Sequence, residues 1–174
     1  ITRNVDWKIK SFEFDNMFSY GKGNKITFEK LNGLIGVVAP NASGKSSLLD
    51  AISYTIYDTC SRAWKAIEVL NKKTKRFKAK LNLEINGESY WIERIGELKS
   101  RRSRKTKETT YSCPVDVKFY MEDNDEIIDL TGAARKNTQY GSGTNEEIRK
   151  ILGTFDDFIL TSLSCLLYTS DAAD

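Results

Sequence analysis

Residues 34–52 read LIGVVAPNASGKSSLLDAI, and this stretch decides the fold class. It begins with the continuous apolar run Leu34–Val38, which predicts a fully buried central strand. Apolar residues then recur every three or four positions from Leu48 to Ile56, which is the period of an amphipathic helix. The order strand, loop, helix predicts an α/β protein whose connecting loop lies at a helix N-terminus.

The loop Ala39–Ser46 has the composition of a phosphate-binding P-loop. Gly44 lets the backbone come close to the phosphates, Lys45 can reach the β- and γ-phosphate oxygens, and the hydroxyl of Ser46 suits Mg²⁺. The strict motif begins with glycine, whereas this chain has Ala39, which a looser form allows. The sequence therefore predicts a nucleotide site, with a lysine-containing strand-to-helix turn as the plainer alternative.

Length and composition limit the class of protein. A chain of 174 residues is about the size of one domain, and 40% hydrophobic with 29% charged residues is typical of a globular one. No apolar run reaches the ~18 residues of a membrane span, and no charged-then-apolar leader marks the chain for export. We expect a cytoplasmic protein, or one of the nucleoid or of a host-cell compartment if viral, that is not secreted and has no membrane partner.

The residue types also limit the chemistry. The chain has no histidine, the commonest general base and metal ligand, and its three cysteines form no CxxC pair. We expect the cysteines to be reduced and structural. Any catalysis must then use carboxylates, lysine and a bound metal.

Antiparallel strands are expected on both sides of the P-loop. Apolar spacing predicts strands from Trp7 to Asp15 and from Lys25 to Phe28, and alternation predicts another from Val115 to Met121. Residues 81–92 contain Asn86-Gly87 between two alternating runs, which predicts a β-hairpin with a two-residue turn.

The remaining segments are expected to be helices and one loop. Residues 97–112 are polar and aperiodic, which predicts an exposed loop or insertion. A short helix is expected within Ser61–Leu70. Thr144–Glu147 matches a capping box, so we expect a helix from Asn145 to Leu152, followed by a helical segment within Phe155–Leu163.

Basic residues are concentrated in two runs although the net charge is only +3. One run lies within Lys72–Lys80 and the other within Lys99–Lys107. Each run suits a solvated surface or contact with phosphates about equally. Trp7, Trp64 and Trp91 are expected to pack in the core rather than to stack on bases.

The segment PNASGKSSLLDAI at residues 40–52 resembles the N-terminal lobe of SbcC-type and structural-maintenance-of-chromosomes (SMC) ATPases. Residues Asn16–Tyr20 are similar to a short family segment near the first strand, and Asp156–Ser162 falls in the expected order. The resemblance is nearest to the branch of double-strand-break repair and its phage and viral recombination-subunit relatives. It implies an α/β P-loop NTPase fold, the N-terminal lobe of an ABC-type ATPase head with an antiparallel β subdomain, over residues 1–164.

The same resemblance implies the roles of particular residues. Lys45 acts in catalysis and Ser46 in metal binding, and a loop at Asn71 and Lys72 approaches the nucleotide. Two departures stand out, because Ala42 replaces a family glycine and Phe18 stands where some relatives have arginine. The phosphate-contacting set is expected to be Asn41, Ala42, Ser43, Gly44, Lys45, Ser46 and Ser47.

The resemblance also implies what the parent protein does. Two heads would clamp ATP and Mg²⁺ between them as a homodimer, and each head would need a C-terminal ATPase lobe that follows a long coiled coil in the same parent chain. The implied partners are DNA and an SbcD-type nuclease subunit. The chain then acts as the ATP-binding half of a DNA repair or recombination ATPase, inactive alone, because residues 165–174 resemble a non-native tail where the family's glutamine loop should follow.

Three alternatives to this function remain. A small P-loop kinase would use the basic run Lys99–Lys107 as a lid, and a transporter-type ABC ATPase shares the P-loop. A non-catalytic DNA tether would use nucleotide only to regulate DNA binding through the basic runs.

Overall fold

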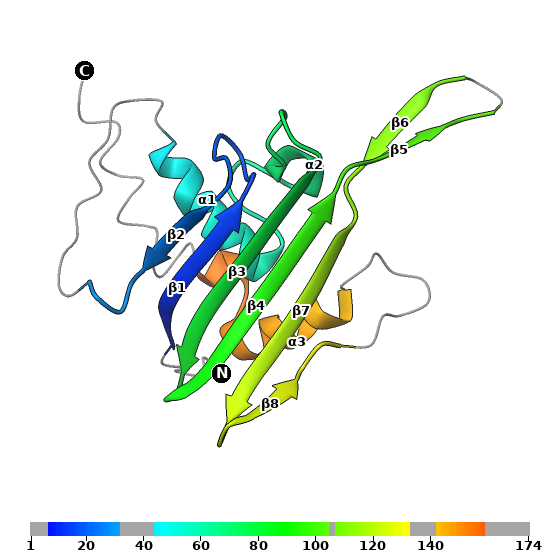
Figure 1. Ribbon diagram of the computed structural model, residues 1–174. Helices are drawn as coiled ribbons and strands as arrows, with labels where there is room; N and C mark the ends of the chain where they lie inside the picture. The colour runs from blue at the N-terminus through cyan, green and yellow to red at the C-terminus, as the bar shows by residue number, and fades with distance from the viewer. Residues whose placement is uncertain (1–6, 32–43, 105–106, 133–141, 159–174) are drawn as a thin grey trace.

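The computed structural model describes residues 7–31, 44–104, 107–132 and 142–158, which form an antiparallel sheet with helices against one of its faces (Figure 1). The expected strand Leu34–Val38 and most of the P-loop lie outside the described residues. The described strands are β1 (Trp7–Asp15), β2 (Asn24–Thr27), β3 (Arg76–Ile85), β4 (Glu88–Glu97), β5 (Lys99–Arg102), β6 (Thr109–Ser112), β7 (Val115–Asp123) and β8 (Glu126–Asp129). The described helices are α1 (Lys45–Tyr57), α2 (Ala66–Val69), α3 (Ser142–Leu152) and α4 (Phe155–Phe158).

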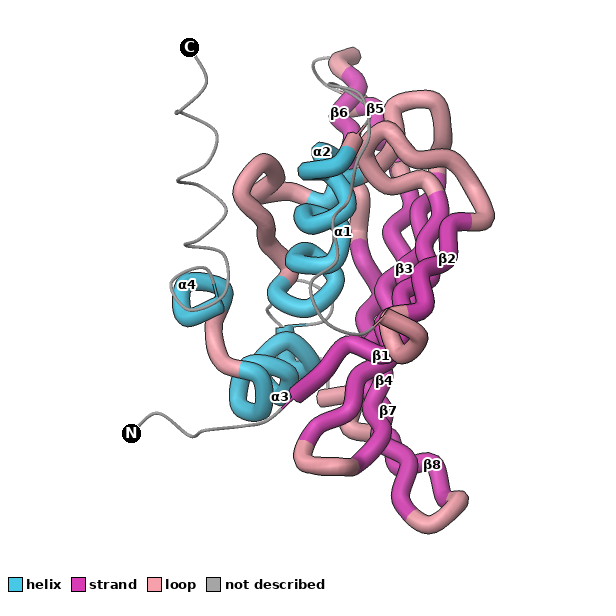
Figure 2. The backbone as a smooth tube through the Cα atoms, turned by 90° about the vertical axis from the view of Figure 1, so that its left-hand side faces the viewer, coloured by secondary structure: helices cyan, strands magenta, loops and turns pink. Residues whose placement is uncertain are grey.

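The large sheet has six strands in the order β2-β1-β3-β4-β7-β8, and every neighbouring pair is antiparallel. Buried and exposed residues alternate along β3, so one face of the sheet is covered and the other faces solvent. Figure 2 shows α1, α2 and α3 on the same side of the sheet. None of the described helices combines the length and apolarity needed to cross a membrane.

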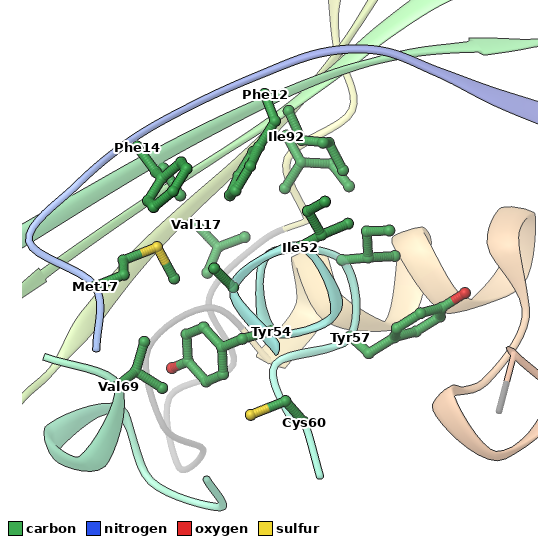
Figure 3. Close-up of a cluster of buried hydrophobic side chains, with 14 of the residues drawn as sticks. Phe12, Phe14, Met17, Ile52, Tyr54, Tyr57, Cys60, Val69, Ile92 and Val117 are labelled. Carbon is green, nitrogen blue, oxygen red and sulfur yellow. The ribbon is translucent and has the colours of Figure 1, made fainter. Parts of the chain in front are cut away.

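The core lies between the sheet and α1. Phe12 and Ile92 from the strands face Ile52 and Tyr54 of α1 in Figure 3, and all four side chains are buried. The aromatic ring of Phe77 on β3 packs edge-on against that of Tyr54 at a centroid distance of 6.1 Å. This packing fixes α1 on the sheet, and with it the position of the helix N-terminus.

A β-bulge in β1 explains the irregular apolar spacing of this strand. Ile9 pairs with Leu83 of β3 and Ser11 pairs with Asn82, so Lys10 is an extra residue without a partner in the register. Before the bulge, the odd-numbered residues of β1 face the core, and after it the even-numbered residues do. Phe12 is therefore buried. The Lys10 ammonium lies 2.9 Å from the Glu84 carboxylate on the open face, and this partner raises the pKa of Lys10.

The hairpin predicted from Asn86-Gly87 is confirmed. These two residues join β3 to β4 with φ angles of 51° and 90°, the left-handed pair that a type I′ turn requires. The strands predicted at residues 7–15, 25–28 and 115–121 are also confirmed in their positions, as β1, β2 and β7.

Residues 97–112 were predicted to form an exposed loop. The predicted exposure is confirmed, but the predicted loop structure is wrong. Lys99–Arg102 pairs with Thr109–Ser112 as a two-stranded antiparallel ribbon, and all eight residues are exposed. The ribbon needs no apolar face, because the two strands satisfy each other's backbone hydrogen bonds. A pattern search based on buried residues cannot detect such strands.

The core position predicted for Trp64 is also wrong. Its side chain is 84% exposed, and the expected helix is reduced to the four residues of α2. The backbone amides of Trp64 and Lys65 donate to the Glu68 carboxylate at 2.8 and 3.1 Å, so Trp64 lies just before the helix rather than on its packed face. Trp7 and Trp91 are half-buried, with ring contacts to Phe158 and Tyr120.

The capping box predicted at Thr144–Glu147 is wrong, because α3 begins at Ser142 and Thr144 lies inside its first turn. A reciprocal pair occurs instead at α4. The backbone amide of Thr154 donates to the Asp157 carboxylate at 3.2 Å, and the Asp157 amide donates to the Thr154 hydroxyl at 3.3 Å. The Thr154 hydroxyl and amide lower the pKa of Asp157.

Candidate nucleotide-binding site

Gly44 is the residue from which α1 begins, and two features of its surroundings require glycine. Its φ angle is +93°, in the left-handed region that other residues rarely occupy. A Cβ atom at this position would lie 2.9 Å from the Ser19 hydroxyl oxygen. Any side chain at this position would strain the backbone and overlap with Ser19, so glycine is required where the chain enters α1.

The first turn of α1 consists of Lys45, Ser46 and Ser47, so the structure places these three predicted residues at a helix N-terminus. The bond from the Leu48 amide to the Gly44 carbonyl, 3.2 Å long, is where the helical hydrogen bonding begins. Within the described residues, α1 has no side-chain cap and no acidic residue in its first turn. This end of the helix carries the positive end of the helix dipole, which favours an anion nearby.

The side chains of this turn differ in exposure. Ser46 is exposed, Lys45 is half-buried, and Ser47 is buried. An exposed hydroxyl can reach a metal that is also held by phosphate oxygens, which is the usual coordination of Mg²⁺ in nucleotide sites. Among the described residues, no group of three or more carboxylates and thiols could hold a metal on its own.

A tyrosine supports the loop from a neighbouring segment. The Tyr20 hydroxyl donates to the Gly44 carbonyl oxygen at 3.0 Å. Tyr20 itself belongs to the connection between β1 and β2, in which Asn16 and Phe18 adopt left-handed φ angles of 57° and 52°. Phe18 therefore contributes a turn and apolar packing at the position where some relatives have arginine.

Asn71 holds the segment that contains Tyr20 by hydrogen bonds to its backbone. Its side-chain amide donates to the Tyr20 carbonyl oxygen at 2.9 Å, and its backbone amide donates to the Asn16 carbonyl at 2.8 Å. The side-chain oxygen of Asn71 accepts from the Lys73 amide at 2.9 Å. The structure thus brings Asn71 to the P-loop end through Tyr20, while the contact of Asn71 and Lys72 with nucleotide stays a prediction.

Three of the predicted phosphate-binding residues, Asn41, Ala42 and Ser43, lie outside the described residues. The described part of the set, Gly44 to Ser47, is brought together with the Tyr20 and Asn71 segments, which are distant in sequence. Sequence reasoning missed Tyr20. Its signal was only its place within the resembling segment Asn16–Tyr20.

A buried arginine of β4 binds the C-terminal end of α1, and sequence reasoning missed this residue too. Arg94 of β4 is fully buried and donates to the carbonyl oxygens of Thr55 at 2.6 Å and Ile56 at 3.2 Å. It also donates to the Asn145 side-chain oxygen at 2.7 Å and lies 3.3 Å from the Asp58 carboxylate. Burial lowers the pKa of Arg94, and the Asp58 carboxylate opposes that effect.

A second buried charge, Asp50, faces away from the P-loop end. Its carboxylate accepts from the Ser61 hydroxyl at 2.7 Å and from the Arg62 guanidinium at 2.5 Å. Asp50 therefore attaches the segment after α1 to the middle of the helix, and it has a structural part rather than a part in phosphate binding.

The sequence profile of a protein family described as AAA domain matches residues 11–171. Among curated proteins, the chain is 32% identical over 179 aligned positions to an uncharacterized protein of Acanthamoeba polyphaga mimivirus, with 99% of the chain and 12% of that protein covered. It is 28% identical over 150 positions to the SbcC component of the nuclease SbcCD of Clostridium acetobutylicum, covering 82% of the chain and 11% of that protein.

The chain is also 30% identical over 161 positions to the DNA double-strand break repair Rad50 ATPase of Sulfolobus acidocaldarius, with 91% of the chain and 15% of that protein covered. The chain therefore spans only about an eighth of the length of the curated relatives that it matches. The matched range includes the whole P-loop together with the Tyr20 and Asn71 segments.

Proposed function

Because this chain belongs to the AAA domain family and is an N-terminal ATPase lobe of the SbcC and Rad50 type, we propose that it binds MgATP at the N-terminus of α1 as part of a DNA-repair ATPase. The α/β P-loop fold with its antiparallel sheet agrees with this membership. The observation that carries the proposal is the left-handed Gly44 followed directly by Lys45 and Ser46 in the first turn of α1.

Each of these residues has a distinct part in the proposed site. The first amides of α1 and the Lys45 ammonium bind phosphate oxygens, so the developing negative charge is stabilised where the β–γ bond breaks. The Ser46 hydroxyl would hold Mg²⁺, and the ion would supply positive charge that offsets the charge of the phosphates. Tyr20 and Asn71 act as positioning residues, since the Tyr20 hydroxyl holds the Gly44 carbonyl and Asn71 holds the Tyr20 backbone.

The proposed site is one half of a composite. Residues that orient the attacking water belong to the C-terminal lobe of the same parent chain and to a second head, so this lobe alone is not expected to hydrolyse ATP. ATP binding would dock two heads as a homodimer, and hydrolysis would release them. The names of the SbcC and Rad50 relatives support DNA as the substrate and an SbcD-type nuclease as a partner.

The strands β5 and β6 form a hairpin that contains the basic run Lys99–Lys107. Its position favours the proposed function over that of a small kinase. A lid must close over the phosphates, yet Tyr111–Val115 at the base of the hairpin lies beside Tyr54 and Asp58, at the opposite end of α1 from Gly44. A helix of 13 residues separates the two ends by about 20 Å. Figure 1 shows the hairpin extending away from the sheet rather than back along α1.

Substitution of the P-loop lysine in the intact protein tests the proposal. Lys45→Ala removes the charge that faces the phosphates and is expected to weaken ATP binding by at least about tenfold to a hundredfold. The matched control is Lys30→Ala, which removes an exposed lysine after β2. Equal ATP affinities of the two variants in a calorimetric titration would refute the nucleotide site.

A further inference from the structure

Two aromatic side chains are exposed at the base of the β5–β6 hairpin. Trp64 is 84% exposed and Tyr111 is 62% exposed, and both line the same cavity of about 400 Å³. The lining of the cavity is mixed, because Lys65 and Ser112 line it together with the two aromatic residues. Large rings that remain in water keep their apolar faces available to a ligand.

The hairpin above this cavity is strongly basic. Residues 99–112 contain six lysines and arginines and one acidic residue, Glu108. Arg101, Arg102 and Arg104 line a second cavity of about 670 Å³. The ion pairs formed within the described part of the chain give none of these three arginines a carboxylate partner.

We propose that these residues form a binding surface for single-stranded nucleic acid, named here the aromatic–basic surface. It consists of Trp64, Lys65, Arg102, Arg104 and Tyr111, and the register places Arg102 on the same face of the ribbon as Tyr111. Unpaired bases stack on Trp64 and Tyr111, and the phosphates that link them lie along the arginines. The inference rests on the proposed DNA function and specifies which form of DNA this surface receives.

The chemistry of the surface favours a single strand over a duplex. In a duplex the faces of the bases are already stacked on one another, and a protein reads only their edges in the grooves. Exposed ring faces therefore gain contacts only from unpaired bases, while arginines alone would serve either form. The excess of positive charge likewise favours a polyphosphate over a protein segment.

The test compares a labelled oligodeoxythymidylate with a blunt duplex of the same length, both bound to the intact protein and followed by fluorescence anisotropy. Trp64→Ala and Tyr111→Ala are each expected to weaken binding of the single strand about 5- to 100-fold and to leave duplex binding unchanged. Trp64→Phe should restore most of the loss, because it retains a ring. Ile127→Ala, which removes an exposed apolar side chain on β8, is the control and should change neither affinity.

A salt titration tests Arg102 separately. The variant Arg102→Ala should reduce the slope of log affinity against log salt for the single strand by about one. Lys30→Ala, at the end of the sheet where β2 stops, should leave the slope unchanged.

The possible outcomes separate this inference from the proposed function. Failure of the unmodified intact protein to bind either DNA would overturn both. Unchanged single-strand affinity in the aromatic variants, with duplex binding intact, would overturn the aromatic–basic surface alone. The same unchanged affinity accompanied by loss of the co-purifying nuclease would assign the surface to a protein partner instead, and equal losses for both DNA forms would show that it does not select single strands.

Discussion

The two ends of α1 are held in opposite ways. At the N-terminal end the chain supplies a glycine, no side-chain cap within the described residues and one tyrosine hydroxyl on the Gly44 carbonyl. At the C-terminal end the carbonyl oxygens of Thr55 and Ile56 are bonded to a guanidinium that is completely buried. The protein satisfies the C-terminal end of α1 with the side chain of Arg94, whereas the N-terminal end is where we propose that an anionic ligand binds.

This difference between the two ends of α1 explains why a buried charged side chain, Arg94, suits the C-terminal end and would not suit the N-terminal end. A buried arginine is costly unless its donors are paired, and Arg94 has acceptors from α1, from Asp58 and from Asn145 of α3. A permanent counter-charge at the Gly44 end would instead compete with phosphates. Arg94 therefore anchors the C-terminal end of α1, and the proposed nucleotide site lies at the other end.

Arg94→Ala should have the largest effect, because it leaves the carbonyl oxygens of Thr55 and Ile56 without this donor and the Asp58 carboxylate without its positively charged partner. We expect the lobe to lose about 3–5 kcal/mol of unfolding free energy. The measurement is chemical denaturation of the intact protein, followed in the transition that contains this lobe. Lys118→Ala, an exposed charge on β7, should change the free energy of unfolding by less than about 0.5 kcal/mol. Similar values for both variants would mean that Arg94 does not anchor the C-terminal end of α1.

Gly44→Ala should mainly affect the N-terminal end of α1, where we propose that nucleotide binds. The left-handed φ and the nearby Ser19 hydroxyl together predict a loss of about 1–2 kcal/mol in stability and a clear loss of ATP affinity. The double variant Gly44→Ala/Ser19→Ala removes the steric overlap but keeps the strained φ, so calorimetry should show partial recovery. Full recovery would mean that the backbone angle is unimportant, and no loss in the single variant would contradict the site geometry.

Tyr20→Phe removes the hydrogen bond to the Gly44 carbonyl and nothing else of the ring. A bond of this kind contributes about 0.5–1.5 kcal/mol, so ATP affinity should fall by about two- to tenfold. Tyr111→Phe, which alters an exposed hydroxyl at the far end of α1, should leave ATP affinity unchanged in the same titration. Equal ATP affinities of the two variants would remove Tyr20 from the description of the N-terminal end of α1.

The smallest effect concerns α4, whose first turn has the side-chain bonding that the described part of α1 lacks. The folded pKa of Asp157 is depressed by its bonds to Thr154, so the stabilisation is present above the unfolded pKa of aspartate, near 4, and is lost as the pH falls through the folded value. Thr154→Ala should reduce this acid-dependent loss of stability, measured as the thermal midpoint at successive pH values. An identical pH profile in the variant would show that the pair has no influence on stability.

Much of the sheet could be predicted because its signals are local. Asn86-Gly87 specifies its turn by backbone preference alone, and the alternation in β7 needs only one buried face. The spacing of β1 was irregular for a physical reason that the sequence could not reveal, since Lys10 becomes a bulge only against the register of β3. Local pattern therefore predicted β1, β2, β3, β4 and β7 but not β8, and strand pairing explained the irregular spacing of β1.

The centre of the proposed site follows from a local motif, whereas the residues that support it could not be predicted from the sequence. Gly44, Lys45 and Ser46 form a motif with its own chemistry, whereas Tyr20 and Asn71 act through bonds between segments about 50 residues apart. Arg94 resembled any other charged residue of a strand, because its acceptors come from α1 and α3. Trp64 was misplaced for the converse reason, since nothing in its own neighbourhood reveals that the core is already filled without it.

The all-exposed hairpin β5–β6 also has a consequence for how this lobe can evolve. Because its eight strand residues are all exposed, we expect substitutions there to change the free energy of folding little. Two lineages that share the buried sheet can therefore diverge freely in this ribbon. The hairpin is where we expect one ancestral head to have been adapted to different substrates.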